Sequence, residues 1–393
     1  MNTPKIRFKG FKDDWEQRKL EDVAEFLDTM RKPLEGARRI PGPYPYYGAS
    51  GIVDYVDGYL FSEELVLLSE DGANITDRNY PVCFLASGKY WVNNHAHVLR
   101  LKDGNENNFV CTSLERKDYK QYNSGMAMPK LNQEVCRRIP IGCPSFNEQK
   151  KIGDYFRNLD NLITLHQRKC DETKQLKKFM LQKMFPKNGE KNPEIRFEGF
   201  TDDWEQRKLG DIASSFEYGL NAAAKEYDGE NKYIRITDID DNTHEFLTDS
   251  LTSPDIDLTG ADNYKLIEGD ILFARTGASV GKSYIYRNSD GLVYYAGFLI
   301  RARIKEECDA EFVFQNTLTD RYNKYIAVTS QRSGQPGVNA QEYAEFEIKV
   351  PKKEEQTKIG TYFRNLDHLI TLHQRKCEKL KELKKFMLQN MFV

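Results

Sequence analysis

The chain contains one long stretch of sequence twice, and this repeat constrains the fold more than any other feature. Gln149 to Phe185 and Gln356 to Phe392 are identical at about 29 of 37 aligned positions, without a gap, at a constant offset of 207 residues. After Gly153 and Gly360, neither copy contains glycine or proline, and both are rich in residues that favour helix. Each copy therefore predicts one helix of roughly 55 Å.

Along each copy, apolar residues recur at a step close to 3.5 residues, which is typical of a coiled-coil seam. We expect this seam to continue through Leu176 and Met180. A helix this long cannot bury such a stripe inside one small domain, so the two copies are predicted to pack against each other. The predicted seam residues are Ile152, Phe156, Leu159, Ile163, His166 and Cys170 in the first copy, and Ile359, Phe363, Leu366, Ile370, His373 and Cys377 in the second.

A second repeat precedes each globular region. Residues 6–24 read IRFKGFKDDWEQRKLEDVA and residues 195–213 read IRFEGFTDDWEQRKLGDIA, at an offset of 189. The chain is therefore interpreted as two tandem units, each a globular domain followed by a long helix. The second domain carries about 18 extra residues, because the offset grows between the two repeats. A breaker-rich linker at residues 186–193 ends the first helix.

Between the repeated flanks the two domains have diverged almost completely, and both predict an α+β fold. Short apolar runs bounded by Gly, Pro, Asp and Asn predict strands at residues 44–49, 52–56, 65–68, 82–85 and 90–101, and at residues 233–237, 270–275, 283–286 and 292–303. Helices are predicted at residues 107–122 and 310–329. Two weak correspondences align residues 65–72 with 270–277, and residues 93–100 with 294–301. Just before the long helices, Pro129, Asn132, Pro144 and Glu148 match Pro336, Asn339, Pro351 and Glu355.

Composition excludes several classes of protein. Seven cysteines without a CxxC motif indicate reduced thiols and a cytoplasmic protein. The sequence contains no run of about 18 apolar residues, so no membrane span is expected. The formal net charge of −2 leaves nucleic-acid binding open, because the distribution of charge matters more than the total.

These motifs and their order resemble the specificity subunit of type I restriction–modification systems. The pattern IRFxGFxxDWEQRKLxDxA, a variable domain and then PxxxEQxKIGxYFRNLDxLITLHQRK occurs twice and covers essentially the whole chain. The resemblance implies two target-recognition domains separated by two antiparallel helices, with each domain reading half of a bipartite site in double-stranded DNA. It also implies two methyltransferase subunits and ATP-dependent restriction subunits as partners. S-adenosylmethionine, ATP and Mg would belong to those partners, and this chain would have no catalytic centre.

On this basis we expect five segments along the chain. They are a first recognition domain at residues 1–146, a first spacer helix at 147–185, a linker at 186–193, a second recognition domain at 194–352 and a second spacer helix at 353–393.

Two alternatives from other classes stay open, a self-contained DNA methyltransferase or endonuclease and a pure coiled-coil scaffold. The chain has no [DNS]-P-P-[FYW] loop of an amino-methyltransferase, and Asn79-Tyr80-Pro81 lacks the second proline. Residues 276–283 read TGASVGKS, which resembles a phosphate-binding loop, but the first position is Thr and a strand is predicted to come next. A strand-connecting turn is therefore favoured.

Histidine and cysteine side chains raise the question of a metal. His95 and His97 would share one strand face, without further ligands at a recognisable spacing. His166 and Cys170 recur as His373 and Cys377, and four ligands could meet if antiparallel helices cross there. A polar seam layer that fixes register is the favoured interpretation, so no metal is expected.

Candidate DNA-reading residues are basic, amide and aromatic side chains on connections between strands. Arginine pairs bidentately with guanine, Asn or Gln pairs with adenine, and Lys or Tyr can hold phosphates. A core role is the alternative for the aromatic residues, and ordinary solvation is the alternative for the others. The candidates are Arg78, Asn79, Tyr80, Lys89, Tyr90, Trp91, Asn93, Asn94 and His95 in the first domain, and Arg275, Thr276, Lys282, Tyr284, Tyr294, Tyr295, Gln331, Arg332 and Gln335 in the second.

Overall fold

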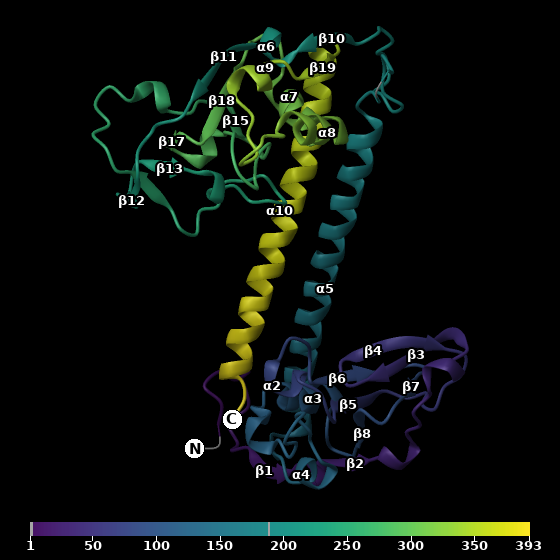
Figure 1. Cartoon of the computed structure of the whole chain (residues 1–393). Coiled ribbons are helices and arrows are strands. Elements are labelled where there is room, and N and C mark those ends of the chain that lie inside the picture. The colour runs from purple at the N-terminus through teal and green to yellow at the C-terminus, as the bar shows by residue number, and fades with distance from the viewer. Residues whose placement is uncertain (1–2, 188) are drawn as a thin grey trace. The chain divides into compact units, whose positions relative to one another are not determined.

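A computed structural model of the chain describes residues 3–187 and 189–393. Two 38-residue helices, α5 (Phe146–Lys183) and α10 (Lys353–Asn390), correspond to the repeated stretch (Figure 1). The chain divides into two compact units, and each boundary falls inside these helices. The first unit ends at His166 and resumes at Arg375, while the second runs from Gln167 to Gln374. Each unit thus holds one globular domain and one half of each helix, which differs from a simple tandem of two units.

The first unit is built on a four-stranded antiparallel sheet of order β2-β8-β5-β6. Its elements are β1 (Glu16–Lys19), α1 (Leu20–Val23), β2 (Ala24–Phe26), η1 (Asp28–Met30), η2 (Gly36–Arg38), β3 (Pro41–Gly48), β4 (Gly51–Val56), β5 (Leu65–Ser69), α2 (Asn74–Asp77), β6 (Cys83–Ala86), β7 (Trp91–Val92), β8 (Ala96–Leu101), α3 (Asn107–Glu115), η3 (Tyr119–Tyr122), α4 (Gln133–Arg137) and β9 (Pro140–Cys143).

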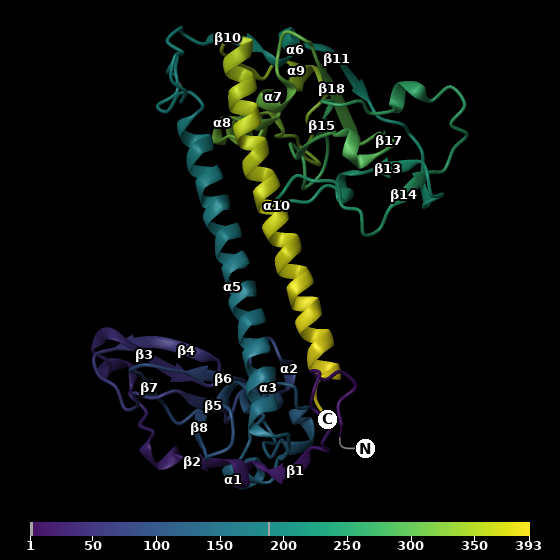
Figure 2. The ribbon, with the colours of Figure 1, turned by 180° about the vertical axis from the view of Figure 1, so that it is seen from behind.

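The four-stranded sheet of the first unit is buried on both faces. Val66 and Leu68 point into a core shared with α3 and α5, while Leu65 and Leu67 point into a second core. This alternation is the period of two expected for a strand. The second core lies beneath a smaller sheet of order β4-β3-β7, which lies on the side away from α5 (Figure 1, Figure 2).

The second unit repeats this plan around a sheet of order β11-β18-β15-β16. Its elements are β10 (Glu205–Lys208), α6 (Leu209–Ile212), β11 (Ala213–Tyr218), β12 (Ala224–Glu226), β13 (Lys232–Ile234), η4 (Ile236–Asp238), β14 (Thr252–Pro254), η5 (Asp262–Tyr264), β15 (Ile271–Ala274), β16 (Ser283–Ile285), η6 (Asn288–Asp290), β17 (Val293–Tyr295), β18 (Leu299–Ile304), α7 (Ala310–Asn316), α8 (Asp320–Thr329), α9 (Ala340–Ala344) and β19 (Glu347–Val350). Ile271 and Phe273 face the helices, and Leu272 and Ala274 face the parallel pair β13–β17.

Sheet register corrects one of the two predicted correspondences between the domains. Ser69 pairs with Ala96, and Ala274 pairs with Leu299, so residues 65–72 do align with 270–277. Because Ser69 and Ala274 are equivalent, their partners Ala96 and Leu299 are equivalent too. The offset between these partners is 203 residues, whereas the sequence alignment used 201. Asn93, Asn94 and His95 therefore correspond to Ala296, Gly297 and Phe298, and the alignment with residues 294–296 was wrong by two.

Several predicted elements are shorter or more broken than expected. The helix predicted at residues 107–122 ends at Glu115, and η3 follows it as a separate turn. The long strands at residues 90–101 and 292–303 each split in two, because the chain leaves the small sheet and enters the large one. The turn in the first domain is closed by the Asn93 side chain, whose Oδ1 accepts from the His95 N–H at 2.8 Å. The helix predicted at residues 310–329 is two helices, because Thr319 caps a new one by accepting from the Tyr322 N–H.

The repeated flanks join each domain to its long helix. β1 pairs with β9, and β10 pairs with β19, just before α5 and α10 begin. Arg7 donates to Glu148 at 2.6 Å in the first unit, and Arg196 donates to Glu355 at 2.6 Å in the second. The residues matched in the two repeated motifs therefore contact each other where each domain meets its long helix.

Within each unit the two helix halves run antiparallel and bury apolar residues together, as predicted. In the first unit Phe156 lies 5.7 Å from Phe392, and in the second Phe185 lies 5.8 Å from Phe363, measured between ring centroids. Equivalent backbone hydrogen bonds join the repeated flanks to the C-terminal ends of the two long helices. The Ile6 N–H donates to Asn390 O at the end of α10, and the Ile195 N–H donates to Lys183 O at the end of α5, each at 2.9 Å.

One predicted seam residue is wrong. Leu176 is 44% exposed. A continued 3.5-residue step reaches Lys177 instead, whose ammonium pairs with Asp367 at 2.6 Å. In the first unit Lys384 pairs with Asp160 at 2.5 Å in the same way. The seam position predicted for Leu176 is therefore held by Lys177 and its salt bridge.

Candidate nucleic-acid interface

One backbone frame recurs at the end of the central strand of each domain. In the first, the Glu70 N–H donates to His95 O at 2.9 Å, and Glu70 O accepts from the Leu131 N–H at 2.7 Å. In the second, the Arg275 N–H donates to Phe298 O at 3.1 Å, and Arg275 O accepts from the Val338 N–H at 2.9 Å.

Two residues further along each chain segment, one more equivalent backbone hydrogen bond is present in both domains. We call these shared hydrogen bonds the frame. The Gly72 N–H donates to Pro129 O at 3.0 Å, and the Gly277 N–H donates to Pro336 O at 3.1 Å. Both glycines have positive φ, a conformation that disfavours other residues. Equivalent backbone positions therefore present glutamate in one domain and arginine in the other.

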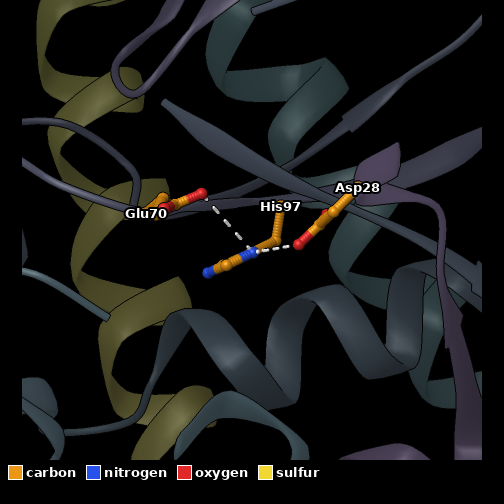
Figure 3. Close-up of side chains that lie close together, drawn as sticks. All are labelled: Asp28, Glu70 and His97. Carbon is orange, nitrogen blue, oxygen red and sulfur yellow. Dashed lines mark hydrogen bonds and ion pairs between the residues drawn. The ribbon is translucent and has the colours of Figure 1, made fainter. Parts of the chain in front are cut away.

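In the first domain, the carboxylate at this position is already neutralised. Arg31 donates to Glu70 at 2.7 Å, and the Lys130 ammonium lies 3.4 Å from the same carboxylate. His97 lies beneath it on β8, with Nδ1 3.8 Å from Glu70 and 2.6 Å from Asp28 (Figure 3). These side chains bring together η1, β5, β8 and the loop before α4.

The side chains of Asp28, Glu70 and His97 are close enough to suggest a metal site, but their hydrogen bonds show an ion network. His97 Nε2 lies 2.8 Å from Leu131 O, which can only accept, so this nitrogen donates. Nδ1 donates to Asp28. Neither ring nitrogen keeps a lone pair for a cation, as a ligand would require.

The charges in this network shift the pKa values of both central groups. Burial alone would lower the pKa of His97, but hydrogen bonds and charge interactions, chiefly with Asp28, outweigh it and raise the pKa to about 10. Burial likewise opposes ionisation of Asp28, yet the hydrogen bond and charge of His97 lower the pKa of that carboxyl overall. The pair is therefore ionised at neutral pH.

Most of the predicted basic and amide candidates lie on the surface. In the first domain Arg78, Asn79, Tyr80, Lys89, Asn94 and His95 are exposed, and in the second Gln331, Arg332 and Gln335 are exposed while Arg275, Thr276 and Lys282 are half-buried. Several already have partners within the protein. Arg78 pairs with Glu115, Arg332 with Glu342, Lys282 with Asp241, and the ring of His95 with Asp71.

Five of the predicted candidates are buried. Tyr90, Tyr284 and Tyr294 lie in the cores, and Asn93 holds the turn before β8. The Tyr90 hydroxyl donates to Glu63 O at 3.1 Å, and the Tyr284 hydroxyl donates to Asp290 at 2.6 Å. Their burial favours the core role that the sequence had left open for aromatic residues. Tyr295 is also buried, and Trp91 is half-buried with Nε1 donating to Lys32 O.

Several exposed residues beside the frames were missed by the sequence reasoning. Lys130 follows the matched Pro129, which was the one available signal for it. Tyr218 is 43% exposed and Phe298 is 61% exposed, and both rings lie close to the Arg275 guanidinium. No sequence signal distinguishes an exposed ring from a buried one. In the first domain Lys89 lies over the Tyr59 ring, with Nζ 4.7 Å from its centroid.

The other predicted motifs are also placed by the structure. Residues 276–283 form a turn that leads into β16, so this run is a strand connection and not a phosphate-binding loop. Cys170 Sγ lies 4.0 Å from Ile370 O, and Cys377 Sγ lies 4.0 Å from Ile163 O. Both thiols are buried on the seam. All seven cysteines are buried.

The family profile described as "Type I restriction modification DNA specificity domain" matches residues 12–175 and 201–382. This chain belongs to that family. Both matched stretches contain one repeated flank, one variable domain and most of one long helix. Membership makes the chain a non-catalytic DNA-specificity component, so the alternative of a self-contained methyltransferase or endonuclease is not supported.

Individual relatives agree with this assignment. The MjaVIII type I restriction enzyme specificity subunit of Methanocaldococcus jannaschii is 22% identical over 95% of this chain and 91% of its own length. A provisionally named specificity subunit of Haemophilus influenzae, S.HindORF215P, is 35% identical, but the match spans 37% of this chain and only 36% of that protein.

The fold is also known from a crystal structure. The type I restriction-modification system S subunit from M. genitalium has a TM-score of 0.70 at 15% identity, with 100% of this chain and 99% of that chain covered. The predicted α+β fold with two long helices is therefore confirmed. Among the described residues, no helix combines the length and apolar character needed to span a membrane.

Proposed function

We propose that this chain is the subunit that selects the DNA target of a type I restriction–modification complex, with each domain reading one block of a bipartite site. The observation that carries this proposal is the recurrence of one backbone frame with different side chains. Glu70 and Arg275 occupy equivalent positions, so the same scaffold presents two chemistries to its ligand. Base edges in the major groove are distinguished by such donor and acceptor groups.

We also propose that the helices bind two copies of one methyltransferase subunit. Three exposed apolar residues recur at an offset of 207. In the first unit they are Leu162, Leu383 and Phe386, exposed by 42%, 40% and 52%, and in the second they are Leu369, Leu176 and Phe179, exposed by 41%, 44% and 49%. Packing between the helices would not require identical outer residues. A partner that recognises one set would recognise the other, and exposed apolar clusters favour protein partners.

The catalytic groups would then belong to the partners. S-adenosylmethionine would be bound by the methyltransferase subunits, and ATP and Mg by the restriction subunits. Seven cysteines without a CxxC motif are consistent with a reducing compartment, so we place the complex in the cytoplasm.

Mapping methylated adenines in a host that carries this chain with its methyltransferase partner tests the proposal. The expected target is two short, dissimilar blocks separated by a degenerate gap. Methylation without sequence preference would contradict it. The mass of the assembled methyltransferase complex tests the docking proposal separately, since a single partner copy would be inconsistent with two equal surfaces.

A further inference from the structure

We infer that Arg275, whose guanidinium lies close to the rings of Tyr218 and Phe298, reads a guanine in the DNA block assigned to the second domain. This inference rests on the proposed function and adds the base and the residue that recognises it.

The first argument is the absence of an internal partner. Residues 194–352 are all described by the structure and contain nine arginines. Eight of them have a carboxylate within 4.0 Å, and within this range Arg275 alone has none. Its Nε is also buried without a hydrogen-bond partner among the described residues. Because no carboxylate in the described part of the chain pairs with this guanidinium, an external acceptor would not have to displace an ion pair.

The second argument is the fixed orientation of the guanidinium. Its carbon lies 5.1 Å from the centroid of the Tyr218 ring and 5.8 Å from that of Phe298. The Tyr218 hydroxyl accepts from the Ala340 N–H at 3.3 Å, and Phe298 O accepts from the Arg275 N–H, so both rings are tied to the frame. Aromatic rings stabilise a guanidinium without consuming its donors.

The third argument concerns the kind of acceptor. A guanidinium presents parallel donors that match guanine O6 and N7, and this is the commonest specific arginine contact in the major groove. Phosphate is the competing source of acceptor oxygens. The exposed Phe298 ring beside the guanidinium suits a base edge or a thymine methyl better than a hydrated phosphate. Gln335, on the loop between α8 and α9, has its side-chain amide beside Gly277 and adds this amide to the surface.

The equivalent position in the first domain shows that a charge without an oppositely charged partner is not a requirement of the frame. Glu70 has the same backbone bonds but is neutralised by Arg31 and Lys130. An arginine left without a carboxylate is therefore a property of the second domain's side chains.

The experiment maps methylated adenines in hosts that carry the complete methyltransferase complex with wild-type chain, Arg275→Ala or Arg207→Ala. The wild-type target should contain a G·C pair in at least one block. Arg275→Ala should reduce discrimination at one such pair by about 5- to 150-fold and leave the other block unchanged. The matched control Arg207→Ala removes an exposed arginine that is already paired with Glu205, and it should keep both blocks.

Two further variants separate base reading from phosphate binding and from misfolding. Arg275→Gln should shift the preferred pair from G·C towards A·T, because glutamine pairs with adenine. Arg275→Lys keeps the charge but lacks the planar pair of donors, so it should weaken guanine discrimination while the salt dependence of DNA binding stays. A phosphate contact would give the opposite pattern, in which Arg275→Gln keeps the target and lowers the salt slope by about 1.

The outcomes are distinguishable from failure of the proposed function. A wild-type complex without any bipartite target would refute that function. A bipartite target lacking G·C in both blocks, or one that all Arg275 variants retain, would overturn this inference alone. If Arg275→Ala does not assemble, Arg275→Gln decides, because its expected change is a new preference and not a loss.

Discussion

The two recognition domains use the same backbone and differ in which side chains fill it. In the first domain Glu70 lies in a closed network of ions, with His97 beneath it. In the second domain Arg275 lies close to two exposed rings, and sheet register places Ile300 where the first has His97. Backbone hydrogen bonds hold the frame in both cases, so side chains can change without altering it. This explains how the interiors could diverge between nearly identical flanks.

The difference extends to stability. A buried ion pair is sensitive to loss of either partner, whereas the apolar packing around Ile300 has no such dependence. The first domain should therefore respond to pH at this position and the second should not. The comparison leads to four predictions, in order of decreasing expected effect.

The largest effect should come from replacing one domain. Exchanging residues 25–124 for those of another family member should change one block of the target completely and leave the other block as it was. The shared flanks and both helices stay intact in this chimera. Mapping methylated adenines gives the readout. Simultaneous change of both blocks, in a chimera that still assembles, would show that the domains do not read independently.

The second effect concerns the ion pair of the first domain. Asp28→Asn should lower the free energy of unfolding of the first unit by about 3–5 kcal/mol, because it leaves a buried charge on His97 without its partner. Urea unfolding in a Trp204→Phe background measures this, since Trp15 and Trp91 both lie in the first unit. The matched control Ile300→Val should leave that transition in place.

The same pair predicts a pH dependence with a definite sign. Folding raises the pKa of His97 from its ordinary 6.5 to about 10, so its contribution is complete below about pH 6.5 and is lost as the pH rises towards 10. The slope should approach about 1.4 kcal/mol per pH unit. Asp28 has a lowered pKa, so its contribution is present above pH 3.8 and is lost in acid. Equal alkaline sensitivity in an Asp28→Asn, His97→Ile double variant would assign the effect elsewhere.

The third prediction treats both domains alike. Each long helix has 38 residues, or about 57 Å, and we propose that this length sets the gap between the blocks. Four residues inserted after Thr173 and four after Leu380 add about 6 Å to each helix and rotate the residues beyond each insertion by about 40°. Some affinity should be lost, and surviving methylation should shift to a gap one or two base pairs longer, with both blocks unchanged. Continued methylation of the original gap, with longer gaps rejected, would show that the helices do not set it.

The smallest effect should come from one exposed amide. Asn94 lies on the turn before β8, where the second domain has Gly297. If Asn94 reads an adenine, Asn94→Ala should relax the first block by about 1–3 kcal/mol at one position. An unchanged methylation pattern would mean that this side chain is simply solvated.

The sequence predicted best those features that depend on long, regular patterns. The repeat and its 3.5-residue step identified both helices and the burial of one against the other. The prediction was wrong at Leu176, because the most apolar residue was chosen there instead of the residue that the 3.5-residue period gives. That residue is Lys177, which forms a salt bridge with Asp367.

The recognition surface was predicted less well for a different reason. The correspondence of Asn93 with Tyr294 was wrong by two residues, because divergent side chains carry little information about backbone register. Burial of Tyr90, Tyr284 and Tyr294 depends on which strand faces meet, and this is a property of the assembled sheets. Arg275 was identified from its type, but its lack of a partner could be seen only among the other arginines of the folded domain.

The composition of the first unit has a consequence for synthesis on the ribosome. Its core includes Met391 and Phe392, whose neighbours include Trp15 and Phe109. Domains usually mature in the order in which they emerge. The second unit is one continuous stretch, Gln167 to Gln374, so all of its residues are translated before residue 375. The first unit also contains residues 375–393, so its core stays incomplete until Phe392 has left the ribosomal tunnel. A premature stop codon just before Met391 would therefore damage a recognition domain whose strands are all translated before Phe146.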